Sequence, residues 1–523
     1  MIEKISANSV NTSKKPSMNE PRFTGLTDGL LSIVQTCERN PMVNVAVLDL
    51  STAIIPRTVV ESETNPYAGF EAFRREASGL IINCMIPSLV VLGIAKLIER
   101  PMMGGKTKMG SCWANEETIN LVKKYWEDDD VKNLKTDKRV RVTIENFIND
   151  FNGADESGLK SFRELIKDKK AFTKLANTVI KPTKYSNKQI KQAFKLIAEQ
   201  THITENIKVG DMKDYTSQNL KAITKALPEI LKAFIDGKDA TVVAKKASHL
   251  VNAKSLAGLG VILPLAIAAQ PINRWITAKR SGKKGAPIYK DFAQSKSEEL
   301  TSQEKKALAK QKLISVGSMI GVALLSMMKI PNMAMLKEVT QFKGIFPTMD
   351  QARVISTATF ASRMMASEDK NDLREATVRD IATFSSFYFL GDYVAKGIAT
   401  FIQKHSKKGI KLINVLETPD KNANALKRFW HWAKHTALKS SDEVIGKEAQ
   451  KMRAICQLGN IAFSLISLGI IIPKIYRGQT DKKRQEQLKK MGIDPTKFYP
   501  HFAKNSINFA SKSNTYKDFF TSK

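Results

Sequence analysis

Five stretches of apolar residues, each as long or nearly as long as a membrane-spanning helix, stand out along the chain. Four of them carry no charge except Lys96 in the first. About 20 apolar residues are enough for a helix to cross the hydrocarbon core of a bilayer, which is roughly 30 Å thick. We therefore predict an all-α fold with four membrane-spanning helices. The four stretches are 79–98, 255–272, 313–328 and 456–472.

The fifth stretch, 381–402, contains Asp392 and Lys396. A charge near the bilayer centre costs roughly 3 kcal/mol, which argues against a span here. We expect this stretch to lie along the interface or to be re-entrant, so that four spans leave both termini in the cytoplasm. Five spans, arranged as an inverted repeat of the transporter type, are the alternative topology.

A soluble protein with deeply buried helices is the other explanation for apolar stretches. Core helices typically show apolar runs of 10 to 14 residues, and the stretches in this chain are longer. They are also rich in glycine and other small residues, which are common where membrane helices pack closely. The membrane interpretation is therefore favoured.

Short markers around the apolar stretches recur in the same order in the two halves of the chain. The distance from Arg75 to Leu92 is 17 residues, and that from Arg374 to Leu390 is 16. This order predicts an internal duplication in which the first copy carries a long insertion. The markers are Ser51-Thr52-Ala53 with Arg57, Arg75-Glu76-Ala77-Ser78, Leu92-Gly93 with Lys96, and 259–264 in the first half, and Ser356-Thr357-Ala358 with Arg363, Arg374-Glu375-Ala376-Thr377, Leu390-Gly391 with Lys396, and 468–473 in the second.

The duplication and the apolar stretches together divide the chain into six parts. The insertion is expected to form a basic helical domain and to be the place where a protein partner binds. The parts are a disordered polar leader at 1–30, a first module at 31–100, the insertion at 101–254, two apolar stretches joined by a basic loop at 255–330, a second module at 331–475 and a basic tail at 476–523.

Helical spacing of apolar residues runs through the insertion. Ser186 and Gln189 form a capping-box pattern ahead of one apolar face, and 159–166 carries another apolar stripe. Further on, Pro228 stands where a new helix could begin, and Gly237 is a stop signal. No segment alternates as a strand does.

The chain is strongly basic, with a formal net charge of +32. Arginine supplies only 19 of the 83 basic residues, whereas base recognition favours the arginine fork. We therefore disfavour nucleic acid as the partner and expect an anionic membrane surface, which attracts juxtamembrane lysines. Basic clusters adjoin three of the stretches: Arg74 and Arg75; Arg274, Lys279, Arg280, Lys283 and Lys284; and Lys474, Arg477, Lys482, Lys483 and Arg484.

Ionisable residues beside or inside the apolar stretches are the site candidates, because such groups are costly in a membrane and often functional. The favoured alternative is structural, with arginine–carboxylate neighbours pairing and lysines reaching towards the headgroups. The candidates are Arg57, Arg75, Glu76, Lys96, Arg363, Arg374, Glu375, Asp392 and Lys396.

Metal and cofactor chemistry finds little support. His431 and His435 are four residues apart, which could place both imidazoles on one helix face, but a metal site needs at least one more ligand. Trp430 and Trp432 in the same segment favour a basic aromatic helix at the membrane interface. The four cysteines show no paired spacing and are expected to be buried thiols. We expect no cofactor.

No nucleophile, base and orienting group converge in the sequence, so we expect a protein that is not an enzyme. The leading hypothesis is an integral membrane scaffold or interaction protein. A carrier built from repeats is the alternative, and it requires Asp392 and Lys396 to face a cavity. A soluble nucleic-acid-binding protein is the third hypothesis, and it predicts binding that weakens steeply with salt.

Overall fold

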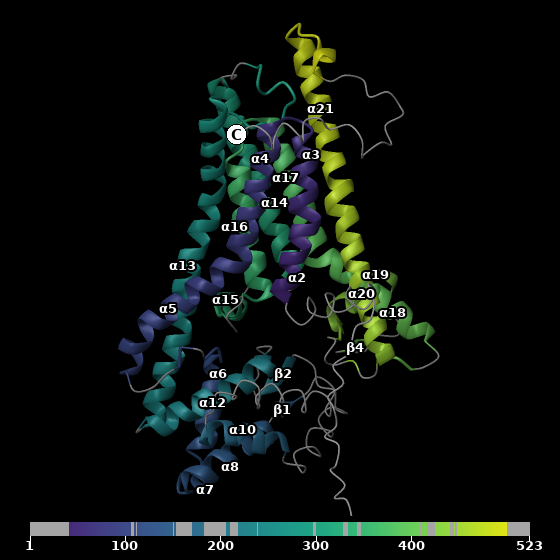
Figure 1. Ribbon diagram of the computed structural model, residues 1–523. Helices are drawn as coiled ribbons and strands as arrows, with labels where there is room; N and C mark the ends of the chain where they lie inside the picture. The colour runs from purple at the N-terminus through teal and green to yellow at the C-terminus, as the bar shows by residue number, and fades with distance from the viewer. Residues whose placement is uncertain are drawn as a thin grey trace, which may run out of the picture.

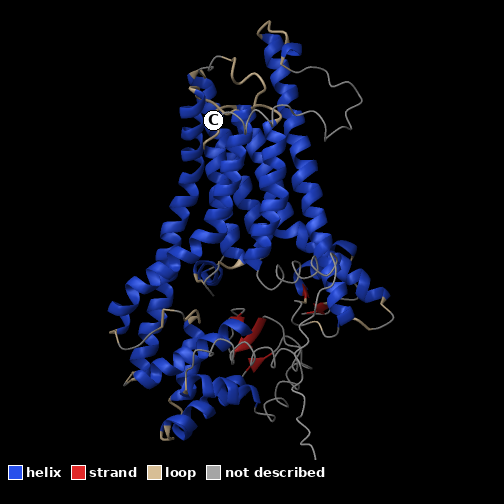
Figure 2. Ribbon diagram, viewed as in Figure 1, coloured by secondary structure: helices blue, strands red, loops and turns tan. Residues whose placement is uncertain are grey.

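A computed structural model describes residues 41–498, except for 106–108, 111, 150, 153–169, 182–205, 210–217, 238, 296–299, 328–332, 343–346, 407–408, 416–423, 440–443 and 445–446. Helices dominate it, as predicted, and its strands are only two to four residues long (Figure 2). The helices form a long bundle above a smaller helical unit (Figure 1).

The bundle is built from helices that run alternately up and down in the view of Figure 1. Several of them continue through a π-helical turn, so that one long helix carries three labels, as α4, η2 and α5 do. The elements are α2 (Pro41–Leu48), η1 (Asp49–Ile54), α3 (Ile55–Ser62), α4 (Pro66–Leu80), η2 (Ile81–Met85), α5 (Ile86–Met103), α13 (Ala240–Ser281), α14 (Ser302–Met327), α16 (Met349–Met365), α17 (Lys370–Ser385), η3 (Ser386–Leu390), α18 (Gly391–His405), α20 (Lys447–Ile466), η4 (Ser467–Ile471) and α21 (Ile472–Lys490).

Among the described residues, four helices are long and apolar enough to cross a membrane. They are Pro66–Met103, Ala240–Ser281, Ser302–Met327 and Glu448–Lys490, and they coincide with the four predicted stretches, of which 313–328 extends one residue past the described helix. The fifth stretch, 381–402, lies in the helix formed by α17, η3 and α18 and is not among them. The chain therefore has the helices of a multi-pass membrane protein.

Large apolar side chains are exposed on the outside of these helices. On α13 they extend from Leu256 to Trp275, and on α20 to α21 they extend from Ile455 to Ile475. At 1.5 Å per residue each series covers about 29 to 30 Å, which matches the hydrocarbon thickness of a bilayer. We call these exposed residues the apolar belt. Exposed apolar faces of this height are suited to lipid and are rare on water-soluble proteins.

The helices α16 and α17 form the centre of the bundle. Met365 is the only exposed residue of α16, and α17 with η3 exposes only Lys370 and Leu390. Local sequence defines where they begin: Thr348 and Gln351 make a capping box ahead of α16, and Asp369 caps α17. These enclosed helices contain charges, so their hydropathy alone does not mark them as membrane helices.

The smaller unit, here called the lower unit, contains α6 (Glu116–Trp126), α7 (Asp129–Lys132), α8 (Thr136–Asn149), α10 (Lys170–Ile180), α12 (Leu220–Asp236) and the first turns of α13. An antiparallel sheet of β1 (Phe151–Asn152), β2 (Asn206–Val209) and β3 (Gln218–Asn219) accompanies them. Its core is aliphatic and aromatic and includes Ile144, Phe147 and Ile230. This part of the chain therefore has a hydrophobic core of its own.

One prediction for the insertion is wrong, and two others fall outside the described residues. Pro228 does not begin a new helix, because it lies inside α12, which continues through it to Asp236. The prolines that start helices occupy the first turn, whereas this one is tolerated in the interior. The predicted helix after Ser186 and the stripe at 159–166 lie outside the described residues.

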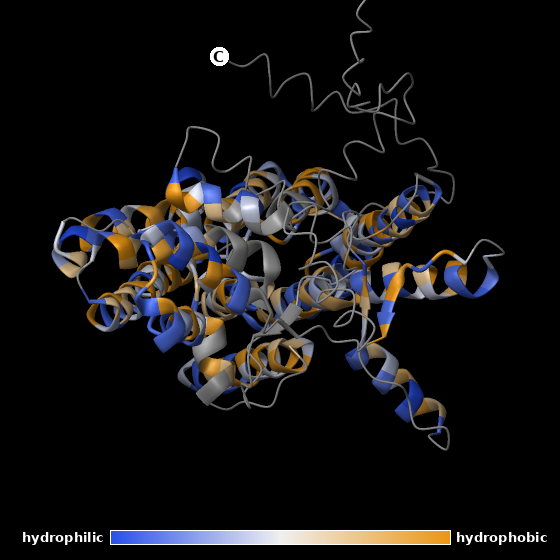
Figure 3. Ribbon diagram, turned by 90° about the horizontal axis from the view of Figure 1, so that it is seen from below, coloured by the Kyte–Doolittle hydropathy of each residue, from blue (hydrophilic) through white to orange (hydrophobic). Residues whose placement is uncertain are grey.

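The remaining described elements lie at the lower end of the bundle. They are α15 (Met333–Thr340), α19 (Ala425–His435) and the antiparallel pair β4 (Ile413–Val415) and β5 (Thr436–Leu438), while the short η5 (Pro495–Lys497) follows α21. Seen from below and coloured by hydropathy, the helices each carry both hydrophilic and hydrophobic residues (Figure 3). The faces of each helix, rather than whole helices, are thus divided between polar and apolar surroundings.

Candidate functional site

Four carboxylates and four arginines alternate in a closed ring of ion pairs inside the bundle. Every member is at most 5% exposed apart from Arg477, which is 7% exposed. We call this set the ion-pair ring. Its nitrogen–oxygen distances are Glu76–Arg75 2.9 Å, Arg75–Glu61 2.9 Å, Glu61–Arg477 3.3 Å, Arg477–Glu375 4.0 Å, Glu375–Arg379 3.8 Å, Arg379–Asp380 3.0 Å, Asp380–Arg363 3.4 Å and Arg363–Glu76 3.6 Å.

Five helices supply the ring: α3, α4, α16, α17 and α21. The turn into α4 is fixed by Asn65, whose side chain accepts from the Ala68 amide, and the turn into α17 by Asp369, which accepts from Asn371 and Asp372. These caps set the rotation of both helices, so that the charged residues of each face the same space. The ring therefore joins segments from both halves of the chain.

Further hydrogen bonds hold the ring. Arg57 donates to Glu76 over 3.3 Å and to the Thr383 hydroxyl over 2.5 Å. Tyr476 donates to Glu61 over 3.2 Å, and Thr480 to Glu375 over 2.7 Å. The desolvation cost of buried charges is offset only when their hydrogen-bonding capacity is used in this way. Glu76 is the most connected member, because three arginines contact its carboxylate.

The ring lies partly at the height of the apolar belt and partly at its upper edge, because Arg477 stands two positions after Ile475. Pro56, beside Arg57, packs against Gly469, which stands between the exposed Ile466 and Ile470. On another side, Ser362, beside Arg363, donates to the carbonyl of Ile267, itself an exposed belt residue. Arg57 and Arg363 are thus enclosed at a level where the outer surface is apolar.

A second bridge accompanies the ring. Arg274 of α13 contacts Glu71 of α4 at 3.0 Å and Asp372 of α17 at 2.8 Å. Its side chain is 12% exposed, and it links the helix that arises in the lower unit to both halves of the bundle. Together the ring and this bridge tie six helices to one another at their upper parts.

The structure brings five of the predicted residues together: Arg57, Arg75, Glu76, Arg363 and Glu375 all belong to the ring or contact it. Sequence reasoning missed four members of the ring, which are Glu61, Arg379, Asp380 and Arg477. A usable signal existed for two of them. Arg75-Glu76 and Arg379-Asp380 each stand ten and eleven residues after a helix-capping residue, namely Asn65 and Asp369.

The other predicted residues lie elsewhere. Lys96 is exposed on α5, and Arg374 is half-buried on α17 outside the ring. One Arg374 nitrogen, Nη2, is buried and has no hydrogen-bond partner among the described residues. These two residues therefore contribute nothing to the ring geometry.

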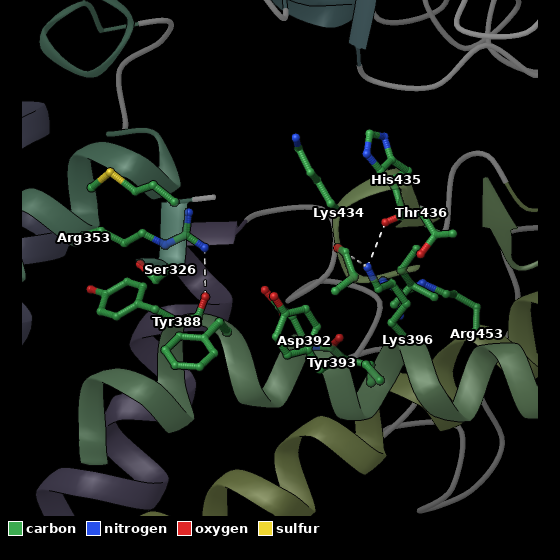
Figure 4. A pocket seen from close by; sticks show the side chains of 17 residues that line it. Ser326, Arg353, Tyr388, Asp392, Tyr393, Lys396, Lys434, His435, Thr436 and Arg453 are labelled. Atoms are coloured by element: carbon green, nitrogen blue, oxygen red, sulfur yellow. Dashed lines mark hydrogen bonds between the residues drawn. The ribbon is translucent and has the colours of Figure 1, made fainter. Parts of the chain in front are cut away.

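Asp392 and Lys396 line a cavity of about 780 Å³ at the lower end of the bundle (Figure 4). The end of α14, the start of α16, η3 with α18, the α19–β5 segment and α20 form its walls. Its position is close to the edge of the apolar belt, because the lining residue Arg453 stands two positions before Ile455. The carboxylate of Asp392 points into this space from α18 (Figure 4).

Lys396 has a structural role in this cavity. Its ammonium donates to the carbonyls of Trp432, Ala433 and Thr436 over 3.3, 2.9 and 2.9 Å. These carbonyls belong to the C-terminal turn of α19, where a cation is favoured by the helix dipole. The three protons of the ammonium are thereby used, and Lys396 anchors α19 to α18.

The two histidines of α19 stack on one another, with ring centroids 4.5 Å apart and an interplanar angle of 25°. Among the described residues no group of three or more histidine, cysteine or acidic side chains could hold a metal ion. Outer residues of the same helix are apolar and exposed, notably Leu426, Phe429 and Trp430. Helix α19 is therefore amphipathic as well as basic.

Three of the four cysteines, Cys84, Cys112 and Cys456, are described, and all are buried free thiols, as predicted. Burial raises the pKa of Cys112, in the loop after α5, to about 12. This thiol is consequently protonated and unreactive at neutral pH.

Comparison with protein-family models, with curated proteins and with solved structures finds no match for this chain.

Proposed function

We propose that this chain is an integral membrane scaffold in which two related helical modules are joined by the ion-pair ring. The supporting observation is the inverted distribution of polarity, with charges enclosed at the level where the outer surface is apolar. In water such an arrangement exposes apolar area and buries ions, both of which cost free energy. In a bilayer the same arrangement places each group in favourable surroundings.

Contacts in the ring support the predicted duplication. The Arg57–Glu76 distance of 3.3 Å corresponds to Arg363–Asp380 at 3.4 Å, and Arg75–Glu76 at 2.9 Å corresponds to Arg379–Asp380 at 3.0 Å. These contacts favour a register in which Arg75-Glu76 matches Arg379-Asp380, in place of Arg374-Glu375.

Positions six residues after each capping residue also correspond. Glu71 on α4 is contacted by Arg274 from α13, and Glu375 on α17 is contacted by Arg477 from α21. Each of the two charged helices then passes into a π-helical turn, η2 or η3. We infer that α3 to α5 with α13 form one module, and that α16 to α18 with α20 and α21 form the other.

We propose that the upper end of the bundle faces the cytoplasm. The end of α13 and the part of α21 beyond the apolar belt both lie at this end (Figure 1), and the exposed Lys279, Lys284 and Lys482 lie in them or directly after them. Cytoplasmic loops carry such an excess of lysine and arginine. Because α2 begins at the lower end, the described chain has its two ends on opposite sides, unlike the four-span expectation.

The lower unit is the proposed site of a protein partner, since it is folded around its own core and stands apart from the ring. A nucleic-acid role gains no support from the arginines. Seven of the 19 are buried, and four of these are paired with carboxylates within the ring, so they are not available to a nucleic-acid backbone.

Alkaline carbonate extraction of membranes tests the proposal. The full chain, with a reporter at its C-terminus that works only in the cytoplasm, should stay in the membrane fraction and give an active reporter. Single cysteines at Lys284 in the upper loop and Asp130 in the lower unit, with Cys37 replaced by serine, should react with an impermeant maleimide from opposite sides. The buried thiols provide a silent background. Release by carbonate contradicts the membrane proposal.

A carrier is the second candidate, because Asp392 and Lys396 both line a cavity. Two observations weaken it. Lys396 is engaged as a helix cap, and the cavity is at the edge of the apolar belt, whereas carriers bind substrate near the bilayer midplane. Substitution of Asp392 by asparagine distinguishes the two, since a scaffold keeps its function and a carrier loses transport with the fold intact.

A further inference from the structure

The cavity beside α19 has an excess of positive charge. Arg353, Lys396, Lys434 and Arg453 line it, and Asp392 is the only acidic residue among the residues that do so. Asp350, which pairs with Arg353 at 2.6 Å, lies outside the lining. A concave site with several cations and one carboxylate favours an anionic ligand.

Lys434 can contact a ligand directly, and Arg353 contributes a fixed positive charge to the cavity. Lys434 is exposed, and Figure 4 shows its side chain at the rim of the cavity. Arg353 is held in place by Asp350 and by the carbonyl of Tyr388 at 2.9 Å, while its Nε is buried and has no hydrogen-bond partner among the described residues. A fixed guanidinium and a mobile ammonium are typical partners of a phosphate oxygen.

The rest of the lining is largely apolar or aromatic. Met327 comes from α14, Phe389 and Tyr393 from η3 and α18, and Leu438 from β5. Such a wall suits the glycerol and first methylenes of an amphipathic molecule. The exposed Leu426, Phe429 and Trp430 of α19 lie on the helix whose C-terminal turn forms one side of the cavity. Aromatic and aliphatic residues of this kind are enriched at the headgroup level of membranes.

We propose that this cavity binds the phosphate group of an anionic phospholipid at the membrane interface. The assignment of the phosphate group to a lipid rests on the proposed membrane function. The assignment of a phosphate group as the ligand rests on the cations of the cavity alone. The site lies at the edge of the apolar belt, where headgroups are found. Bound lipid then joins α14, α16, α18 and α19 at the end of the bundle that the ion-pair ring does not reach.

The test is native mass spectrometry of the full-length protein in a neutral detergent, with equal amounts of phosphatidylglycerol or phosphatidylcholine added. The wild type should retain phosphatidylglycerol preferentially. One lysine near an anionic headgroup contributes about 1 kcal/mol, so Lys434→Gln should weaken retention about fivefold. Lys427→Gln is the matched control, since Lys427 is an exposed lysine of the same helix that does not line the cavity. Asp392→Asn should tighten retention by a similar factor.

The second part of the test measures the binding of inorganic phosphate to the same variants. Inorganic phosphate should bind most tightly to Asp392→Asn and most weakly to Lys434→Gln. If it does so while phosphatidylglycerol is not retained, the cavity is a phosphate site whose ligand is free phosphate rather than a lipid headgroup. This result can be obtained even if carbonate extraction has excluded the membrane proposal. Equal weakening by Lys434→Gln and Lys427→Gln means general surface attraction and overturns the site. Absence of retention of both probes by the wild type also overturns it.

Discussion

The bundle buries charged side chains as well as apolar ones, whereas the core of the lower unit is mainly aliphatic and aromatic. In the lower unit charges such as Asp129 and Lys132 are 89% and 49% exposed. In the bundle Arg57 and Asp380 are fully buried, whereas Leu256 and Ile466 are 65% and 50% exposed. A side chain is buried or exposed according to the solvent that surrounds its part of the protein. On the proposed membrane function, the bundle is therefore the part that meets lipid and the lower unit is the part that meets water.

The two cores also differ in how they specify structure. The lower unit is held by close packing, in which many weak contacts add up and directions matter little. The ring is held by a few strong and directional contacts, each of which needs a partner of opposite charge at a fixed position. Helices that meet lipid on their outer face gain no hydrophobic driving force for association, so polar contacts take over that role.

Glu76→Gln is the most severe test of the difference between the bundle and the lower unit. This substitution leaves three arginines facing a neutral amide in the bundle, and breaking a buried ion pair costs about 4 kcal/mol. We expect loss of a monodisperse bundle in detergent size-exclusion chromatography. Glu63→Gln removes the same charge at the exposed end of α3 and should change nothing. A stable Glu76→Gln variant would show that the ring does not hold the bundle.

The core of the lower unit is tested by Ile144→Ala. Ile144 is fully buried on α8, and its truncation should cost about 3 kcal/mol. Hydrogen exchange should become faster in α6, α8 and α12, with α16 and α17 unaffected. Lys138→Ala, an exposed position on the same helix, is the control. Simultaneous loss of protection in both regions would contradict two separate cores.

Ile466→Lys tests whether lipid surrounds the apolar belt. A lysine in the middle of a lipid-facing surface costs roughly 2.5 kcal/mol and should lower membrane retention of the chain. The same change at Ile235, an exposed residue of α12, should stay within about 0.5 kcal/mol because water surrounds that surface. If both substitutions are equally mild in thermal unfolding, the apolar belt does not face lipid.

The smallest effect is expected from Lys396→Met. It removes the ammonium from the C-terminal turn of α19, where such a cation contributes about 1 kcal/mol. Hydrogen exchange in α19 should become faster, while the ring is unchanged. Lys404→Met, an exposed lysine on the same α18 helix, should leave α19 as it is. Unchanged exchange in the first variant would show that Lys396 does not anchor α19.

The sequence predicted the four apolar helices because lipid selects composition residue by residue, and such a signal can be read locally. It pointed to half of the ring because Arg75, Glu76, Arg363 and Glu375 stand in recurring markers, as does Arg57, which contacts the ring. It missed Glu61 and Arg477, which come from opposite ends of the chain and become partners only when α3 and α21 pack together.

The cavity shows the same limit of prediction from sequence. The sequence shows Asp392 and Lys396 as ionisable residues within an apolar stretch. It does not show whether their side chains face a cavity. Its walls come from α14, α16, α18, α19 and α20, and only tertiary packing assembles them. The engagement of Lys396 by α19 carbonyls depends on a helix more than 30 residues away, so no local pattern could reveal it.

Helix α13 has a mechanical consequence. It runs unbroken from Ala240 to Ser281, through Pro264 and Pro271, and is therefore a rod of about 63 Å. Its lower turns belong to the core of the lower unit, and its upper turns carry Arg274 between Glu71 and Asp372. A tilt of 10° about one end displaces the other end by about 11 Å for a rod of that length. A displacement of the lower unit would therefore be transmitted along α13 to Arg274 and its two carboxylates at the upper end of the bundle.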